Sequence, residues 1–314
     1  MTLFPLRLVP ADTHIDFIGR RTVAYAVSAT IVLLSIGAYL VNGLNYGIDF
    51  KGGILIEVRT PGPANLDELR GRLAGLGLGE VALQEFGTET DVLIRIERQA
   101  GGEEAQQAAV EKVKEALADT VRNYRRTEFV GPKVGGELIE AGIIAVVLSL
   151  LGIMAYVWFR FEWQFSVAAI VALTHDVIAT IGLFSILGLE FNLSSVAAVL
   201  TIAGYSINDT VVVFDRIREN LRRYKTMDLR ELIDLSVNQT LSRTVLTSGT
   251  TLVTALALMI FGGPVLSGFA TAFVFGILIG TYSSIFVASA LLMYTPSVRI
   301  GKFAPSAEQR AQPG

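Results

Sequence analysis

Long uncharged stretches alternate with charged segments along the chain, and several have the length of a membrane-spanning helix. About 20 apolar residues are enough to cross the hydrocarbon core of a bilayer. Residues 244–298 are uncharged but contain Gly262-Gly263-Pro264, which cannot continue a helix and divides this stretch in two. The pattern predicts six spans: residues 22–41, 141–159, 163–189 and 191–214, and the two halves of residues 244–298.

The first apolar stretch has two interpretations, because Arg20 and Arg21 precede it as they would in a cleaved signal peptide. The apolar core of a signal peptide usually has about 7 to 15 residues, so the longer stretch here favours an uncleaved anchor. An even number of spans then places the two tails, residues 1–21 and 299–314, on the same side of the membrane.

Lysine and arginine residues predict which side that is. The two tails and the links after the second and fourth spans together carry 14 of them, and the other two short links carry none. Short basic loops stay in the cytoplasm. We therefore expect both termini to be cytoplasmic and residues 42–138 to lie outside. The second to sixth spans are expected within residues 139–298.

The external segment, residues 42–138, changes from the apolar pattern to short periodic elements. Strands are predicted at residues 54–59, 81–86, 92–97 and 124–130, and helices at residues 65–76 and 103–121, the first capped by Asn65. The order βαββαβ is that of a ferredoxin-like α+β domain. A loosely ordered loop is the alternative, but long loops without structure are uncommon.

Two glycine-rich joints flank this domain. Glycine permits positive φ and proline fixes one torsion, so each joint can set the angle between the domain and the membrane. Spacing alone equally allows simple turns. The candidate hinge residues are Gly52 and Gly53 in the first joint, and Gly131, Pro132, Gly135 and Gly136 in the second.

Composition and motifs exclude several classes of function. The chain is 52% apolar, its mean hydropathy is +0.53 and its net charge is −3, so no basic excess suggests a nucleic-acid partner. It has no cysteine and only two histidines, and we expect no metal or cofactor. No Gly-x-x-x-x-Gly-Lys-Ser/Thr loop and no recognisable catalytic set occur, so we expect neither a nucleotide-driven motor nor an enzyme.

Ionisable residues within the spans need a reason, because burial at bilayer depth costs at least about 2.5 kcal/mol. Asp209 lies in the fourth span beside Asn208 and Thr210, and Arg243 stands at the start of the fifth. We expect Asp209 and Arg243 to meet at the same depth. They form either a structural ion pair or a protonatable relay, and the relay is favoured because intramembrane acids of transporters often carry protons.

His175 and Asp176, in the middle of the third span, are a weaker candidate for a proton path. No cation in the other spans is an obvious partner, so a structural role is favoured here.

The predicted cytoplasmic link, residues 215–243, is charged and amphipathic. Asp215 and Glu219 are one turn apart, so the fourth span is expected to continue as a salt-bridged helix. Residues 228–241 are expected to lie along the membrane surface. Their apolar side carries Leu229, Leu232, Ile233 and Leu235.

Three motifs resemble the SecF family, membrane subunits that work with SecD in bacterial protein export. They are GIDFKGG at residues 47–53, VGP at residues 130–132, and GYSINDTVVVFDRIREN at residues 204–220. The resemblance covers nearly the whole chain. It implies a member of the resistance-nodulation-division superfamily in the bacterial cytoplasmic membrane, paired with six-span SecD beside the SecYEG channel.

The implied role is to use the proton motive force to help pull or release the exported, unfolded polypeptide. By motif match, Asp209 and Arg243 would lie on the path of the protons. Two alternatives remain open. An efflux subunit of the same superfamily resembles this span layout but has much larger external domains, and a non-transporting scaffold would leave the buried charges unexplained.

Overall fold

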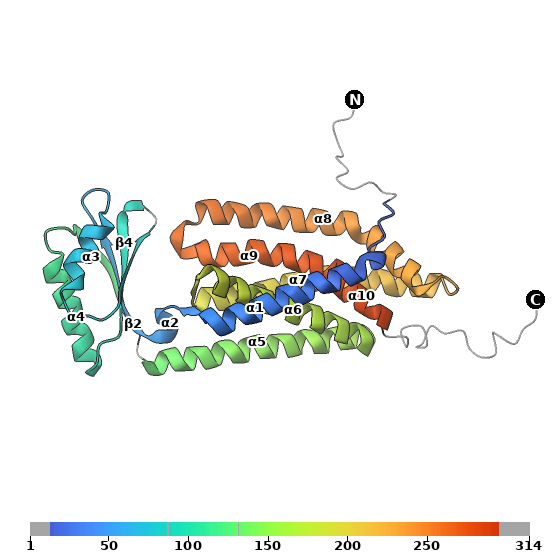
Figure 1. The fold of residues 1–314 in the computed structure, drawn as a ribbon, viewed down its shortest axis with the longest axis horizontal. Coiled ribbons are helices and arrows are strands. Elements are labelled where there is room, and N and C mark those ends of the chain that lie inside the picture. Colours follow the sequence, from blue (N-terminus) through green and yellow to red (C-terminus); the bar gives the residue numbers. More distant parts are fainter. Residues whose placement is uncertain (1–12, 87, 131, 295–314) are drawn as a thin grey trace, which may run out of the picture.

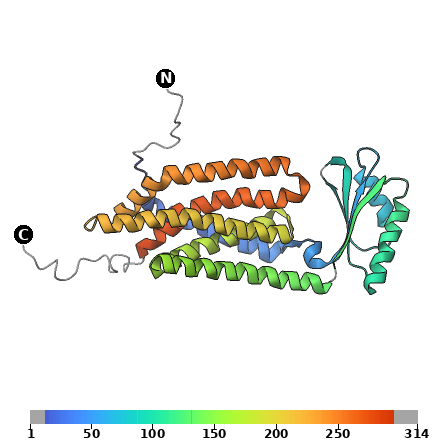
Figure 2. The same ribbon diagram turned by 180° about the vertical axis from the view of Figure 1, so that it is seen from behind.

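The computed structural model describes residues 13–86, 88–130 and 132–294. The protein is elongated, with a bundle of long helices and a small sheet-containing head beyond one end of it (Figure 1). We call this the head end of the bundle and the opposite one the far end. The start of α1 and the end of α10 both lie at the far end, as the reverse view also shows (Figure 2).

The six-span prediction is confirmed: six helices in the described part of the chain are long and apolar enough to cross a membrane. Four short links join the last five of them in sequence, and the sixth span continues through a π-helical segment (Ser284–Ala288), α10 (Ser289–Leu291) and a final 3-10 turn (Leu292–Tyr294). The long helices are α1 (Arg21–Asn42), α5 (Pro132–Arg160), α6 (Trp163–Leu187), α7 (Leu193–Arg223), α8 (Leu229–Phe261) and α9 (Gly263–Ser283).

The helices end where the sequence provides a cap or a break. Gly188 follows α6 in the left-handed conformation, at φ 61°, which glycine adopts without strain. Asn192 caps α7 in a reciprocal arrangement with Ser195, in which each side chain accepts from the other residue's backbone N–H. At the predicted break, α8 stops before Gly262 and α9 starts at Gly263. These links place consecutive helices side by side and antiparallel.

The head is a four-stranded antiparallel sheet with strand order β3-β4-β2-β5, covered on one face by two helices (Figure 1). This arrangement confirms the predicted βαββαβ ferredoxin-like domain, and the Asn65 side chain accepts from the Glu68 N–H at 3.2 Å as the predicted helix cap. The elements are β2 (Gly53–Arg59), α3 (Leu66–Ala74), β3 (Val81–Phe86), β4 (Thr88–Ile96), α4 (Gly102–Ala116) and β5 (Asn123–Val130).

A short segment before the head is held to the bundle. β1 (Asn45–Tyr46) pairs in parallel with β6 (Glu190–Phe191), which lies between α6 and α7. The next element, α2 (Ile48–Lys51), is anchored as well, because the Leu193 N–H donates to Asp49 Oδ2 at 3.0 Å. The glycine-rich sequence of the first joint thus contains a helical turn fixed to the bundle.

The second joint, for which the sequence allowed a hinge or simple turns, is helical over most of its described length. α5 begins at Pro132, so Gly135 and Gly136 lie in its first turns. A Cβ atom at Gly135 would collide with the carbonyl oxygen of Phe50 in α2. Gly135 therefore permits close packing of α5 on α2, and Gly131 lies outside the described residues.

Gly52 and Gly53 stand between α2 and β2 with φ values of 73° and 143°. Residues with a Cβ atom rarely adopt such torsions. The first joint therefore has a backbone conformation that requires glycine.

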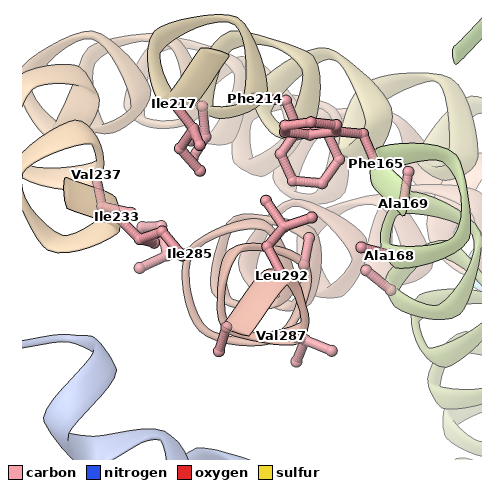
Figure 3. Close-up of a cluster of buried hydrophobic side chains, with 14 of the residues drawn as sticks. Phe165, Ala168, Ala169, Phe214, Ile217, Ile233, Val237, Ile285, Val287 and Leu292 are labelled. Carbon is pink, nitrogen blue, oxygen red and sulfur yellow. The ribbon is translucent and has the colours of Figure 1, made fainter. Parts of the chain in front are cut away.

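The largest apolar core of the bundle brings together α6, α7, α8 and the end of the sixth span (Figure 3). Leu232 and Ile233, near the start of α8, are fully buried in it. The prediction that residues 228–241 lie along the membrane surface is therefore wrong. Their apolar side packs against protein, and the segment continues without a break into the fifth span.

Candidate functional site

The carboxyl group of Asp209 is buried at the contact between α7 and α8. The residue is 2% exposed. Ser248 Oγ donates to Asp209 Oδ2 at 3.1 Å, and Thr247 Oγ1 approaches Asp209 Oδ1 at 3.4 Å. Ser248 Oγ also lies 2.8 Å from Thr281 Oγ1 in α9. The buried acid is therefore connected through hydroxyl groups to two neighbouring helices.

Arg243 lies one helical turn before Thr247 on α8, and its side chain is exposed. The Thr247 hydroxyl also donates to the Arg243 carbonyl oxygen at 3.0 Å. Within the described part of the bundle, the ion pairs do not include one between Arg243 and Asp209. The two residues lie on neighbouring turns where α7 packs on α8. They do not form an ion pair in this conformation, although they were expected to meet at the same depth.

A second buried acid, Asp176, connects three helices and is fully buried. Ser206 Oγ from α7 donates to its Oδ2 at 2.6 Å, and Ser283 Oγ from α9 donates to the same oxygen at 2.7 Å. These two serines could not be predicted as partners of Asp176, because they lie 30 and 107 residues away along the chain and no local pattern links them to it.

His175 completes this second cluster, with its Nδ1 2.9 Å from Asp176 Oδ1. Its Nε2 is buried and has no hydrogen-bond partner within the described chain. The ion pairs of the described residues give Asp176 no arginine or lysine partner. Three donors from three helices fit the structural role that was favoured for this pair.

The two polar neighbours of Asp209 point in different directions from it. Thr210 is buried, and its hydroxyl lies 2.8 Å from Ser284 Oγ and 3.2 Å from the Ser206 carbonyl oxygen. Asn208 is exposed on the surface of α7. Neither side chain contacts the carboxyl group of Asp209 among the described contacts, so Ser248 and Thr247 are the site residues that sequence reasoning missed.

The exposed surface of α7 beside the site carries small and polar residues, and that of α8 carries polar residues among apolar ones such as Leu246 and Val253. On α7 the exposed residues include Thr201, Gly204 and Asn208, and on α8 they include Thr250 and Thr254 at helical spacing from Arg243. Small and polar residues on a membrane helix usually face another helix or water, and seldom lipid. The surface around Asp209 is therefore suited to a further helix.

The chemistry available here is that of a carboxyl group that can gain or lose a proton. No group of three or more histidine, aspartate or glutamate side chains in the described residues could hold a metal ion. Six apolar helices, a ferredoxin-like head and an acid buried between two spans define a polytopic membrane protein with an ionisable group inside its helix bundle.

Comparison with known proteins gives the family. The pattern of the family described as "Protein export membrane protein SecD/SecF, C-terminal" matches residues 109–297, and the "SecD/SecF GG Motif" matches residues 40–60. The protein translocase subunit SecF of Rickettsia akari is 49% identical over 298 residues, which cover 93% of this chain and 95% of that protein. The chain belongs to the SecD/SecF family of protein-export membrane proteins.

Two solved structures resemble the whole fold. The crystal structure of SecDF from Thermus thermophilus, described as a translocon-associated membrane protein, gives a TM-score of 0.81 at 39% identity over 93% of this chain. A crystal structure of SecDF in a super-membrane-facing form gives 0.70 at 38% identity over 94%. This chain spans 40% of the length of each of those SecDF chains.

Proposed function

We propose that the chain is an accessory subunit of the bacterial Sec translocase that acts with SecD and uses the proton motive force to promote late stages of export. Beyond family membership, one observation carries this proposal. Asp209 is buried between two spans and its described partners are hydroxyl groups. Arg243 stands on α8 one turn before Thr247, which is one of these partners. A scaffold role would leave the placement of this buried acid near a cation unexplained.

The proposed cycle uses movement of α7 against α8. Desolvation favours the neutral form of a carboxyl group, whereas a nearby guanidinium favours the charged form. Arginine stays protonated, so Arg243 serves as the fixed charge and Asp209 as the group that loads and unloads. A shift that brings Arg243 onto Asp209 would release the proton, and the conformation described here, without that ion pair, is the loaded one.

The proposed partner is SecD, packed on the polar surface around Asp209. Thr201, Gly204 and Asn208 on α7 support this placement, since an exposed asparagine in lipid would be costly. By family resemblance, the assembly would stand beside the SecYEG channel and act on the exported, unfolded polypeptide. The weaker pair His175 and Asp176 would keep α6, α7 and α9 in register during the cycle.

The head is proposed to move relative to the bundle about Gly52 and Gly53. Their positive φ values support a joint at this point. The two SecDF structures match this chain at nearly equal identity and coverage but at TM-scores of 0.81 and 0.70. That difference supports the view that the same parts adopt different arrangements in the family.

The proposed orientation follows the distribution of lysine and arginine. Both termini would be in the cytoplasm and the head on the outer side of the bacterial cytoplasmic membrane. The far end of the bundle, with Arg216, Arg218, Arg222 and Arg223 on the last turns of α7, would then face the cytoplasm.

The proposal is tested by Asp209→Asn and Arg243→Leu, with export measured in the presence and absence of a proton gradient. Asn keeps the shape of the side chain but does not titrate. We expect each variant to insert and to copurify with SecD, yet to lose the gradient-dependent part of export. The matched control is Asp119→Asn, the same change at an exposed position of the head.

Export by Asp209→Asn membranes with the wild-type dependence on the gradient would refute the relay. Failure of the wild-type chain to copurify with a second six-span protein would refute the proposed partnership.

A further inference from the structure

We propose that an ion pair between Arg95 in the head and Glu190 in the bundle is a releasable latch that holds the head in the orientation seen here. The two covalent connections between head and bundle would act as the axis, and the latch as the contact that stops rotation about it. This inference deepens the proposed head movement, and it rests on the proposed function only for the part the latch plays in export.

The covalent connections lie side by side. The chain enters the head at the start of β2 and leaves it at the end of β5, and Gly53 and Val130 are paired neighbours on these adjacent strands. Two adjacent connections leave rotation about the line between them free, so a third contact is needed to fix the head.

Arg95 supplies such a contact on the other side of β2. It lies on β4, where it pairs with Leu55 of β2 and with Ala82 of β3. Its strand neighbours Ile94 and Ile96 are buried beneath the helices of the head. Because side chains alternate along a strand, Arg95 emerges on the uncovered face, which is turned toward the bundle (Figure 1).

Glu190 receives Arg95 from the link between α6 and α7. Arg95 Nη1 pairs with Glu190 Oε2, and the two side chains are 25% and 20% exposed. Partial burial strengthens such a pair relative to one in open solvent. Among the described residues it is the one ion pair that joins the head to the bundle.

The surroundings leave room for Glu190 to pair with Arg95, and the Asn192 side chain also hydrogen-bonds to Glu190. A Cβ atom at Gly47 would lie 2.5 Å from Glu190 Oε1, so glycine there makes room for the carboxylate. The other charged group near Glu190 is Asp49, which is occupied by the Leu193 N–H. Gly268 of α9 also lies near the Glu190 backbone, and residues 244–298 contain no charge.

Other contacts near the head are of a different kind. β1 pairs with β6 by backbone hydrogen bonds, and α2 packs on α5. Both β1 and α2 precede Gly52 in the chain and so belong to the base of the joint. β3 lies against the start of α9, which carries no charge. Arg95 and Glu190 are thus the charged contact that can open while the base stays intact.

The latch is tested by exchanging its charges. The full chain has no cysteine, so Gln107→Cys in α4 and Ser267→Cys in α9 place two spin labels at exposed positions of head and bundle. The distance distribution between the labels is measured in nanodiscs for Arg95→Glu, Glu190→Arg and the double variant. Arg98→Glu, the same charge change at an exposed neighbour, is the control.

We expect each single exchange to broaden the distribution at least twofold, and the double exchange to restore the wild-type width because the pair forms again with reversed polarity. Arg98→Glu should leave the width unchanged. Unchanged widths in both single variants, or a double variant as broad as the singles, would overturn the latch. The measurement reads head orientation without export, so its failure is distinct from failure of the proposed proton-coupled function.

Discussion

Gly53 is the position where the geometry of the joint makes the strongest demand on the sequence. Its φ of 143° lies in a region that residues with a Cβ atom rarely adopt, and holding such a residue there costs about 1–3 kcal/mol. In addition, a Cβ atom would lie 2.6 Å from the Ile96 carbonyl oxygen, which is backbone and cannot move aside. We expect Gly53→Ala to destabilise the pairing of β2 with β4 by about 2 kcal/mol or more.

Amide hydrogen exchange in the intact protein measures this effect locally. Because each 1.4 kcal/mol is a factor of ten, exchange of the β2 and β4 amides should accelerate by roughly 30-fold or more. The control is Gly75→Ala at the end of α3, where φ is −79° and no atom lies within 4 Å of the added Cβ. Equal exchange rates in the Gly53→Ala and Gly75→Ala variants would show that a Cβ atom at position 53 does not destabilise the pairing of β2 with β4.

Three further predictions concern the second buried acid, the head and the topology. Asp176→Asn should reduce gradient-dependent export less than Asp209→Asn. Asp176→Ala should lower the thermal stability, because it leaves the buried Ser206 hydroxyl without a partner, at about 1–3 kcal/mol; equal stability of the two Asp176 variants would contradict this. Arg59 Nε donates to Asp91 Oδ1 at 2.6 Å, and this contact lowers the pKa of Asp91 from 3.8 to about 2. About 2 kcal/mol of head stability should therefore be present above pH 4 and be lost as the pH falls toward 2. Denaturant unfolding of the head at different pH values measures this loss, which should be absent in Asp91→Asn. On intact cells, an impermeant thiol reagent should label Ala100→Cys and spare Lys225→Cys, and the reverse pattern would invert the topology.

The spans and the head could be predicted from the sequence because each depends on local patterns. An uncharged stretch of span length, a cap such as Asn65 and a break such as Gly262-Gly263-Pro264 act within a few residues. The buried polar contacts could not be predicted in this way. Asp176 is held by serines from two other helices, and only the packing of those helices brings them together.

Two errors have the same origin. The apolar side of residues 228–241 predicted a surface helix, because an amphipathic pattern does not distinguish lipid from protein as the covering partner. Gly135 and Gly136 predicted a hinge or turns, but both lie in a helix, and glycine at position 135 serves close packing against Phe50. In both cases the sequence pattern marked positions that need apolar or small side chains, but only the tertiary structure shows what packs against them.

In the proposed mechanism, Asp209 carries the protons that this subunit uses. The direct measurement is proton flux into proteoliposomes that contain the chain and its SecD partner, followed with a pH-sensitive dye under an imposed gradient. Wild type and a Thr250→Val control should pass protons, and Asp209→Asn should reduce the flux to that of empty liposomes. Wild-type proton flux through Asp209→Asn would show that Asp209 does not carry the protons.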